Sequence, residues 1–347
     1  MADSSGSWDA RRILHFTTCD TGGVPLAIRS LVDASPALEH YVLAPGGDFG
    51  TNCRDVFATG SGATSCVRAL RQAVARTRPD LIHAHSSRAG VISRVIPNRV
   101  PVVYQPHALA FERGAFGLGT RLAARSVEWA LARRTAAFVA LSQHEADMIS
   151  HLCNGARVGV VPNIPTRLPR AGSSVAALQE APFRVVMAGR IAPQKWPEIF
   201  AMTAEVARCR GLPVEFRWIG DGDVALRHLL EKAGVAVTGW CNTNAVFAEM
   251  ESASVYLHCS RYEGFPLAPL DAMAAGLPVI GTPIPALTEL GVPTFREPEA
   301  LLAEVLELCA NLTYRQASLD RNGSILSQRT AHHLAEAVGR VYQEALR

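Results

Sequence analysis

Residues 261–282 read RYEGFPLAPLDAMAAGLPVIGT, and this stretch decides the fold. It has the pattern of a loop, a short helix and a strand in immediate succession. Pro266 and Pro269 lack a backbone N–H and suit the first turn of a helix, whereas Gly276 suits the position just after its end. The stretch therefore predicts one strand-to-strand crossover of an α/β domain.

Two carboxylates bracket the start of this helix. Glu263 stands just ahead of it, and Asp271 follows eight residues later inside it. The free amides and positive dipole end of a helix N-terminus attract an anion, so a carboxylate beside that anion is expected to bond hydroxyl groups. The pattern predicts a nucleotide-sugar site, with diphosphate on the amides and hydroxyls on the acids. An ordinary helix start without a ligand is the alternative.

The rest of the chain repeats an alternation of strands and helices twice. Strand-like runs in the first half cover 12–18, 40–43, 81–84, 100–104 and 137–141, and those in the second half cover 183–190, 215–220, 235–238 and 254–259. Such alternation predicts parallel, doubly wound sheets. We expect an α/β fold with a first domain at 1–165, a linker rich in Pro, Gly, Ser and Ala at 166–182, a second domain at 183–328, and a last helix over 329–347.

Cations cluster where the first strand of the second domain ends. Gly189 and Arg190 end that strand, and Lys195 is expected at the start of the next helix. Lys195 is one of only two lysines among 34 basic residues, so a lysine here runs against the composition. Ligands of open α/β sheets bind at the carboxyl ends of strands. The two cations are predicted to hold a diphosphate and to offset the charge that grows on it. Two solvated surface cations are the alternative.

These elements, in this order, resemble the retaining glycosyltransferases of the GT-B fold, and glycosyltransferase family 4 in particular. The stretch from Glu263 to Asp271 resembles the E-x7-E signature, with Asp in place of the second Glu. Gly189, Arg190 and Lys195 resemble the G-R-x4-K element. The resemblance implies two Rossmann-like, doubly wound parallel-sheet domains that face a central cleft. It also implies that the last helix, 329–347, packs back on the first domain.

The resemblance further implies an activity, namely transfer of a hexose-type sugar from a nucleotide-diphosphate sugar to an acceptor hydroxyl with retention of configuration. UDP- or GDP-sugars are the expected donors, and no cofactor is expected. Arg190 and Lys195 would hold the diphosphate, Glu263 the sugar hydroxyls and Asp271 the ribose. His107 would approach from the first domain. The acceptor attacks from the front face, and a leaving phosphate oxygen takes its proton.

The implied site residues fall into two groups. The catalytic group is His107, Arg190, Lys195 and Glu263. The donor-binding group is Gly22, Gly23, Gly189, Arg190, Lys195, Gly239, Trp240, Glu263, Gly264, Phe265, Pro266, Leu267 and Asp271.

Two further patterns bear on a metal, and neither predicts one. Asp221 and Asp223 form an Asp-x-Asp directly after a strand, and we interpret it as a turn. His83 and His85 flank Ala84, as at a strand end of the same family, and they lack a further ligand set nearby.

Composition limits the compartment and the partners. The chain has no run of 18 uncharged apolar residues and no N-terminal signal pattern, which indicates a cytoplasmic protein. Residues 1–170 carry 19 Arg against 12 acids, whereas the remainder is net negative. A basic first half favours an anionic acceptor or a membrane surface. Arginines and apolar residues alternate over 119–134, as in a helix in peripheral contact with the inner membrane face. A helix that packs on the sheet is the alternative.

The sequence leaves the acceptor open among a glycan, a lipid-linked sugar and a small molecule; no nucleic-acid partner is expected. Bacterial surface polysaccharide or glycolipid synthesis is the favoured setting. The alternatives are a natural-product glycosyltransferase, a nucleotide-sugar 2-epimerase and a non-catalytic nucleotide-sugar-binding subunit.

Overall fold

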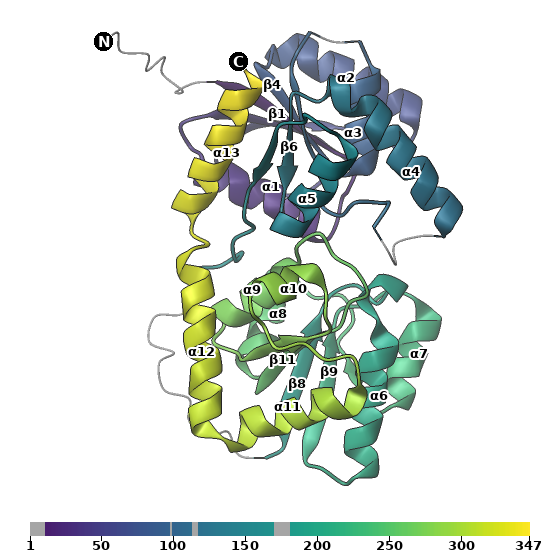
Figure 1. Ribbon diagram of the computed structural model, residues 1–347, viewed down its shortest axis with the longest axis vertical. Coiled ribbons are helices and arrows are strands. Elements are labelled where there is room, and N and C mark those ends of the chain that lie inside the picture. Colours follow the sequence, from purple (N-terminus) through teal and green to yellow (C-terminus); the bar gives the residue numbers. More distant parts are fainter. Residues whose placement is uncertain (1–10, 98, 113–116, 170–180) are drawn as a thin grey trace. The chain divides into compact units, whose positions relative to one another are not determined.

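The structure is a computed structural model that describes residues 11–97, 99–112, 117–169 and 181–347 (Figure 1). The chain forms two compact units: unit 1 is Met1–Ile164 with Thr330–Arg347, and unit 2 is Pro165–Arg329. Both units are α/β with parallel sheets, which confirms the predicted fold class. Most of the predicted linker, 170–180, lies outside the described residues.

Unit 1 is built on a seven-stranded parallel sheet in the order β3-β2-β1-β4-β5-β6-β7. Its strands are β1 Arg12–Thr17, β2 Glu39–Ala44, β3 Cys53–Ala58, β4 Leu81–His85, β5 Val102–Gln105, β6 Ala137–Ala140 and β7 Val158–Val160. Its helices are α1 Gly23–Ala34, α2 Ala63–Thr77, α3 Ser87–Val95, α4 Leu118–Leu131, α5 Gln143–Leu152 and α13 Ala331–Ala345. The central strands are buried, as expected when helices cover both faces of a parallel sheet. The strand order reverses between β1 and β4.

The last helix, α13, belongs to unit 1 although it follows unit 2 in the sequence. It packs against α1, β6 and β7 (Figure 1). The Tyr342 hydroxyl lies 2.8 Å from Nδ1 of His83 on β4. Val341 comes so close to Gly159 on β7 that a β-carbon at position 159 would clash with it. The helix therefore completes the core of unit 1.

Unit 2 holds a five-stranded parallel sheet in the order β10-β9-β8-β11-β12. Its strands are β8 Phe183–Ala188, β9 Val214–Ile219, β10 Ala236–Val237, β11 Val255–His258 and β12 Val279–Gly281. Its helices are α6 Pro197–Cys209, α7 Val224–Lys232, α8 Thr243–Glu251, α9 Leu267–Ala274, α10 Pro285–Glu289, α11 Pro298–Ala310 and α12 Leu312–Ser327. Phe200, Trp218 and Leu257 are among the side chains that fill its core. Here the strand order reverses between β8 and β11.

The two helix starts predicted in unit 2 beside the site differ in outcome. Lys195 does not begin a helix: it ends a 3₁₀ turn, Pro193–Lys195, and α6 starts after Trp196, whose φ of 46° separates the two. By contrast, α9 starts just after Pro266 and is followed by Gly276 with φ 83°, so the two prolines and the glycine bound it as predicted.

None of the helices in the described part of the chain combines the length and the apolar character that crossing a bilayer requires.

Candidate functional site

The carboxyl ends of β8 and β11 form the switch point of unit 2. These strands are neighbours, and the chain builds the sheet outward from them in opposite directions. A crevice for ligands is expected at such a point, beyond the strand ends. Gly189 follows β8 and Ser260 lies just beyond β11. A β-carbon on Gly220, which follows β9, would clash with the Gly189 backbone, so glycine is needed where these two loops meet.

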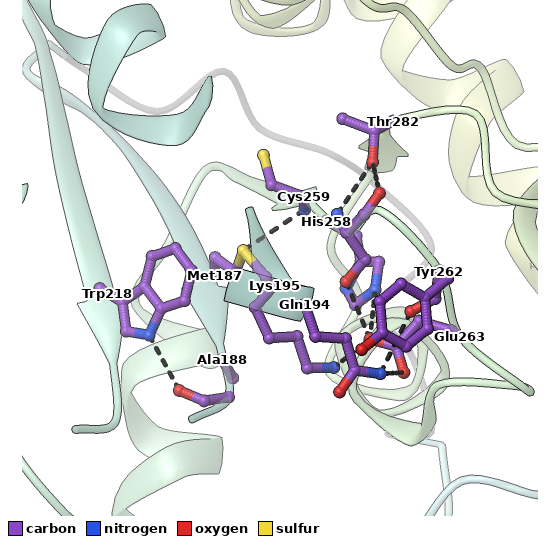
Figure 2. A network of polar contacts seen from close by, with 12 residues as sticks. Met187, Ala188, Gln194, Lys195, Trp218, His258, Cys259, Tyr262, Glu263 and Thr282 are labelled. Atoms are coloured by element: carbon purple, nitrogen blue, oxygen red, sulfur yellow. Dashed lines mark hydrogen bonds and ion pairs between the residues drawn. The ribbon is translucent and has the colours of Figure 1, made fainter. Parts of the chain in front are cut away.

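Glu263 and Lys195 meet at this switch point although 68 residues separate them. Lys195 Nζ donates to Glu263 Oε1 at 2.5 Å, and Ser260 Oγ donates to the same oxygen at 2.8 Å. Gln194 Nε2 donates to Oε2 at 3.2 Å, and Figure 2 shows Gln194 and Lys195 pointing toward Glu263. The Lys195 side chain is only 18% exposed, and the Glu263 side chain is only 10% exposed. Lys195 and Glu263, which are predicted to bind different parts of a ligand, therefore also form an ion pair with each other.

His258, at the end of β11, lies behind this ion pair and was not predicted. Its Nε2 is 3.9 Å from Glu263 Oε1, and its Nδ1 is 3.4 Å from the Tyr256 hydroxyl. Burial, reinforced by the positive charge of Lys195, lowers the pKa of His258 well below its usual value. The buried imidazole is therefore neutral, and its Nε2 has no hydrogen-bond partner among the described residues. Its position at the end of a buried strand beside the site was the signal available in the sequence.

The N-terminus of α9 follows the Glu263 loop directly. Pro266 precedes the first helical residue, Leu267, and the amides of a first turn have no acceptor within the helix. The preceding Phe265 is buried beneath the guanidinium of Arg329, which lies 4.4 Å from the ring centroid. Gly264 joins this aromatic anchor to Glu263. The loop is thus held at both ends, and its amides lie at the carboxyl edge of the sheet.

Asp271 is buried within α9 and already has a partner. Its Oδ1 accepts hydrogen bonds from the Thr166 backbone N–H at 2.7 Å and from the Thr166 hydroxyl at 3.0 Å. Burial raises the pKa of Asp271 to about 6, although the bonds from Thr166 favour the charged form. The ribose contact of Asp271 remains a prediction. It would be made by the other carboxylate oxygen, Oδ2, because Oδ1 accepts from Thr166.

The other predicted donor residues lie on loops at the same edge. Arg190 is exposed beside Gly189. Gly239, with φ 77°, forms a bridge with Gly220, and the adjacent Trp240 ring is 68% exposed. These exposed groups are available to a ligand.

The Asp-x-Asp pair is used locally, which supports the interpretation as a turn. Asp221 accepts a hydrogen bond from the Gly222 N–H and pairs with Arg227 at 2.9 Å. Asp223 caps α7 by accepting from the Leu226 N–H.

Unit 1 places its predicted residues around its own switch point, between β1 and β4. Gly22 precedes α1 with φ 84°, and Gly23 is the first residue of that helix. His107 follows β5 in a left-handed conformation with φ 63°, and its Nε2 lies 3.0 Å from Nδ1 of His85. Burial lowers the pKa of His107 to about 3.

One argument from the sequence is wrong here. His83 and His85 do have a possible third ligand nearby, because β1 pairs with β4 and brings His15 Nδ1 to 3.1 Å from His85 Nε2. One nitrogen of each of the three buried rings lies within 4.8 Å of the others.

Comparison with known proteins identifies the class. The family described as Glycosyltransferase Family 4 matches residues 22–164, and the family described as Glycosyl transferases group 1 matches residues 182–311. One match therefore falls in each unit. The chain belongs to the glycosyltransferases of the GT-B fold.

Individual relatives are distant. The chain is 27% identical over 233 residues to the UDP-Gal:alpha-D-GlcNAc-diphosphoundecaprenol alpha-1,3-galactosyltransferase of Escherichia coli, a match that covers 61% of this chain and 59% of that protein. Sucrose-phosphate synthase of Thermosynechococcus elongatus superposes with a TM-score of 0.79 at 17% identity, over 96% of this chain and 98% of that one. The HepE protein of Anabaena, in complex with UDP and glucose, gives 0.77 at 19% identity, over 96% and 99%.

Proposed function

We propose that this protein is a retaining hexosyltransferase that uses a UDP-sugar and glycosylates a hydroxyl of a lipid-linked or polysaccharide acceptor. The observation that carries the proposal is the Lys195–Glu263 pair at the switch point of unit 2, beside the amides that open α9. The cation and the free amides at this edge of the sheet suit the diphosphate of a nucleotide sugar, and the carboxylate suits its sugar hydroxyls.

The UDP and lipid-linked parts of the proposal are supported by the relatives. The HepE structure contains UDP and glucose, and the name of the E. coli relative specifies a UDP-galactose donor and a sugar on diphosphoundecaprenol. Because the two chains match over 59% of that relative, its substrates are carried over only as part of this proposal.

The proposed reaction exchanges one bond at the anomeric carbon for another on the same face. The bond from that carbon to the β-phosphate oxygen breaks, and the acceptor oxygen bonds to the carbon. The acceptor proton passes to the leaving phosphate oxygen, so the products are UDP and the glycoside. Lys195, Arg190 and the α9 amides offset the charge that develops on the diphosphate, while Glu263 orients sugar hydroxyls.

We also propose that the diphosphate is neutralised by these cations without a metal. Both carboxylates of the Asp-x-Asp turn are engaged locally, by Arg227 and by the start of α7. Activity that persists in EDTA would support this view.

Peripheral contact with an anionic membrane through α4 is part of the same proposal. Buried Glu128 attaches the helix to unit 1, with one oxygen 2.8 Å from Arg94 Nη1 and the other accepting from Tyr104 at 3.1 Å. Most of the other side chains of the helix are exposed, and Trp129 is 66% exposed. Exposed apolar side chains among arginines suit the headgroup region of a bilayer.

Product analysis tests the proposed function. The purified protein would be incubated with UDP-glucose, UDP-galactose or UDP-N-acetylglucosamine and with a diphosphate-linked N-acetylglucosamine on a short polyprenol. We expect UDP and an α-linked disaccharide by NMR, because the donors are α-linked and configuration is retained. UDP together with a free sugar inverted at C2, formed in the absence of an acceptor, would indicate a 2-epimerase. Binding of UDP without turnover of any donor would indicate a binding subunit.

A further inference from the structure

Four buried or half-buried histidines of unit 1 form one continuous hydrogen-bonded chain. His107 Nε2 lies 3.0 Å from His85 Nδ1, and His85 Nε2 lies 3.1 Å from His15 Nδ1. His15 Nε2 lies 3.0 Å from His40 Nδ1, and His40 Nε2 lies 2.9 Å from the carbonyl oxygen of Ser35. The chain thus runs from the loop after β5, through β4 and β1, to β2.

The carbonyl at the inner end sets the direction of every hydrogen bond. A carbonyl oxygen can only accept, so His40 carries its proton on Nε2 and its Nδ1 must accept from His15. The same reasoning applies at His15 and at His85, which also contacts the Gln105 side chain. Burial lowers the pKa of each of these histidines, which keeps the rings neutral with one proton apiece. His107 at the outer end therefore donates through Nε2 and keeps a lone pair on Nδ1.

A metal on His15, His83 and His85 is the competing interpretation of the same cluster. It would explain why His83 Nε2 is buried without a hydrogen-bond partner among the described residues. However, the His83 and His85 rings are tilted against each other with centroids 4.0 Å apart, whereas rings radiating from one tetrahedral zinc stand about 5 Å apart. In addition, His15 Nδ1 and His85 Nε2 already bond each other. The hydrogen-bonded chain accounts for more of the contacts.

We propose that this histidine chain fixes His107 as the Nε2–H tautomer, so that Nδ1 is a hydrogen-bond acceptor for a hydroxyl of a substrate at the carboxyl edge of the unit 1 sheet. His85, His15 and His40 are then positioning residues, which act only through His107. The assignment of the bound hydroxyl rests on the proposed glycosyltransferase function; the tautomer does not. A fixed acceptor selects a sugar hydroxyl that can donate and disfavours an acceptor-only group at the same place.

The tautomer can be measured directly in the protein without substrate. Selective ¹⁵N labelling of histidine and long-range ¹H–¹⁵N correlation distinguish a protonated ring nitrogen from an unprotonated one, with assignment by single His→Gln variants. We expect His107 to be protonated on Nε2 alone. Protonation on Nδ1, or a mixture of tautomers, would overturn the proposal. One equivalent of co-purified zinc together with zinc-shifted resonances of His15, His83 and His85 would also overturn it.

Breaking the chain tests its direction. In His15→Phe, the Nε2–H of His85 would face an apolar ring, and an unmade buried hydrogen bond is costly. His85 is expected to move its proton to Nδ1 and donate to His107, which then becomes the Nδ1–H tautomer. His83→Phe is the matched control, because it makes the same change in the same core outside the chain, and it should leave His107 unchanged. An unchanged His107 tautomer in His15→Phe contradicts the proposed relay.

Kinetics separate this inference from the proposed function. Turning an acceptor into a donor toward a substrate hydroxyl should lower kcat/KM by roughly ten- to a hundredfold in His15→Phe relative to His83→Phe. If the His107 tautomer switches and kcat/KM does not change, the hydrogen-bonded histidine chain is confirmed and the hydroxyl contact of His107 is refuted. If the parent shows no sugar transfer at all, the proposed function is wrong. The NMR result still shows whether the histidine chain fixes the His107 tautomer.

Discussion

Unit 1 should lose stability in mild acid, whereas unit 2 should not. His83 and His107 are neutral in the folded protein, because burial lowers the pKa of each to about 3. The unfolded chain binds protons at these histidines below a pKa of about 6.5. As the pH falls below that value, the unfolded state gains protons that the folded state cannot accept, and the free energy of unfolding decreases.

The size of the effect follows from these values. Between pH 7 and pH 5, each of the two histidines lowers the free energy of unfolding by about 2 kcal/mol, or about 4 kcal/mol together. His15 and His85, whose pKa values burial also lowers, act in the same direction. Glu145 opposes them: burial raises its pKa to about 7, so its protonation in the folded state returns about 2 kcal/mol over the same interval. The histidines therefore prevail in unit 1.

Unit 2 contains opposing groups in closer balance. His258 lowers the free energy of unfolding of unit 2 in acid, for the same reason as the histidines of unit 1. Burial raises the pKa of Asp271 to about 6, so the folded state takes up this proton before the unfolded state does. Protonation of Asp271 therefore adds about 1 kcal/mol to the free energy of unfolding between pH 7 and pH 5. The net change in unit 2 should be small.

Urea unfolding at pH 7, 6 and 5, combined with hydrogen exchange on peptides from β1 and β8, measures the two units separately. Removing one titrating group in His83→Gln should flatten the pH dependence of unit 1 by about 1.4 kcal/mol per pH unit near pH 5. His332→Gln is the control, because that ring is exposed on α13. Equal acid responses of the two units, or a pH-independent unit 1, would refute the reasoning.

Three further predictions concern single side chains. Asp271→Asn should raise the free energy of unfolding of unit 2 at pH 8 by about 1–3 kcal/mol, since the amide oxygen can still accept from Thr166 while the cost of a buried charge is gone; an unchanged or lower urea midpoint would contradict this. Glu128→Ala should cost about 3–5 kcal/mol in unit 1, because Arg94 is left buried and unpaired, and a loss under 1 kcal/mol would show that the pair is dispensable. Trp129→Glu should reduce binding to anionic vesicles at least severalfold while leaving turnover of a water-soluble acceptor unchanged; equal vesicle binding would argue against docking through α4.

The bounds of α9, the helix that opens the site, follow from local signals in the sequence. Pro266, Pro269 and Gly276 bound α9 because each acts through its own backbone, independently of the rest of the fold. By contrast, α12 was missed. Its buried positions include Arg315, Ser318 and Asn322, so polar side chains interrupt the apolar periodicity by which an amphipathic helix is recognised.

Contacts between distant strands were beyond the sequence alone. The i, i+2 spacing of His83 and His85 places them on one face of β4, but only the strand order sets β1, and with it His15, beside them. In the same way, Lys195 and Glu263 could each be assigned to a strand end. Their direct ion pair depends on β8 and β11 being neighbours.

Calorimetric titration of UDP into the protein, with EDTA present, tests the central claim most directly. The parent and Lys232→Met, which changes the other, exposed lysine, should bind UDP with equal affinity. Lys195→Met should bind at least tenfold more weakly, because it removes a cation from the proposed diphosphate site and leaves Glu263 without its partner. Equal affinity in all three proteins, or no binding of UDP to a folded parent, would contradict a nucleotide-sugar site at the β8–β11 switch point.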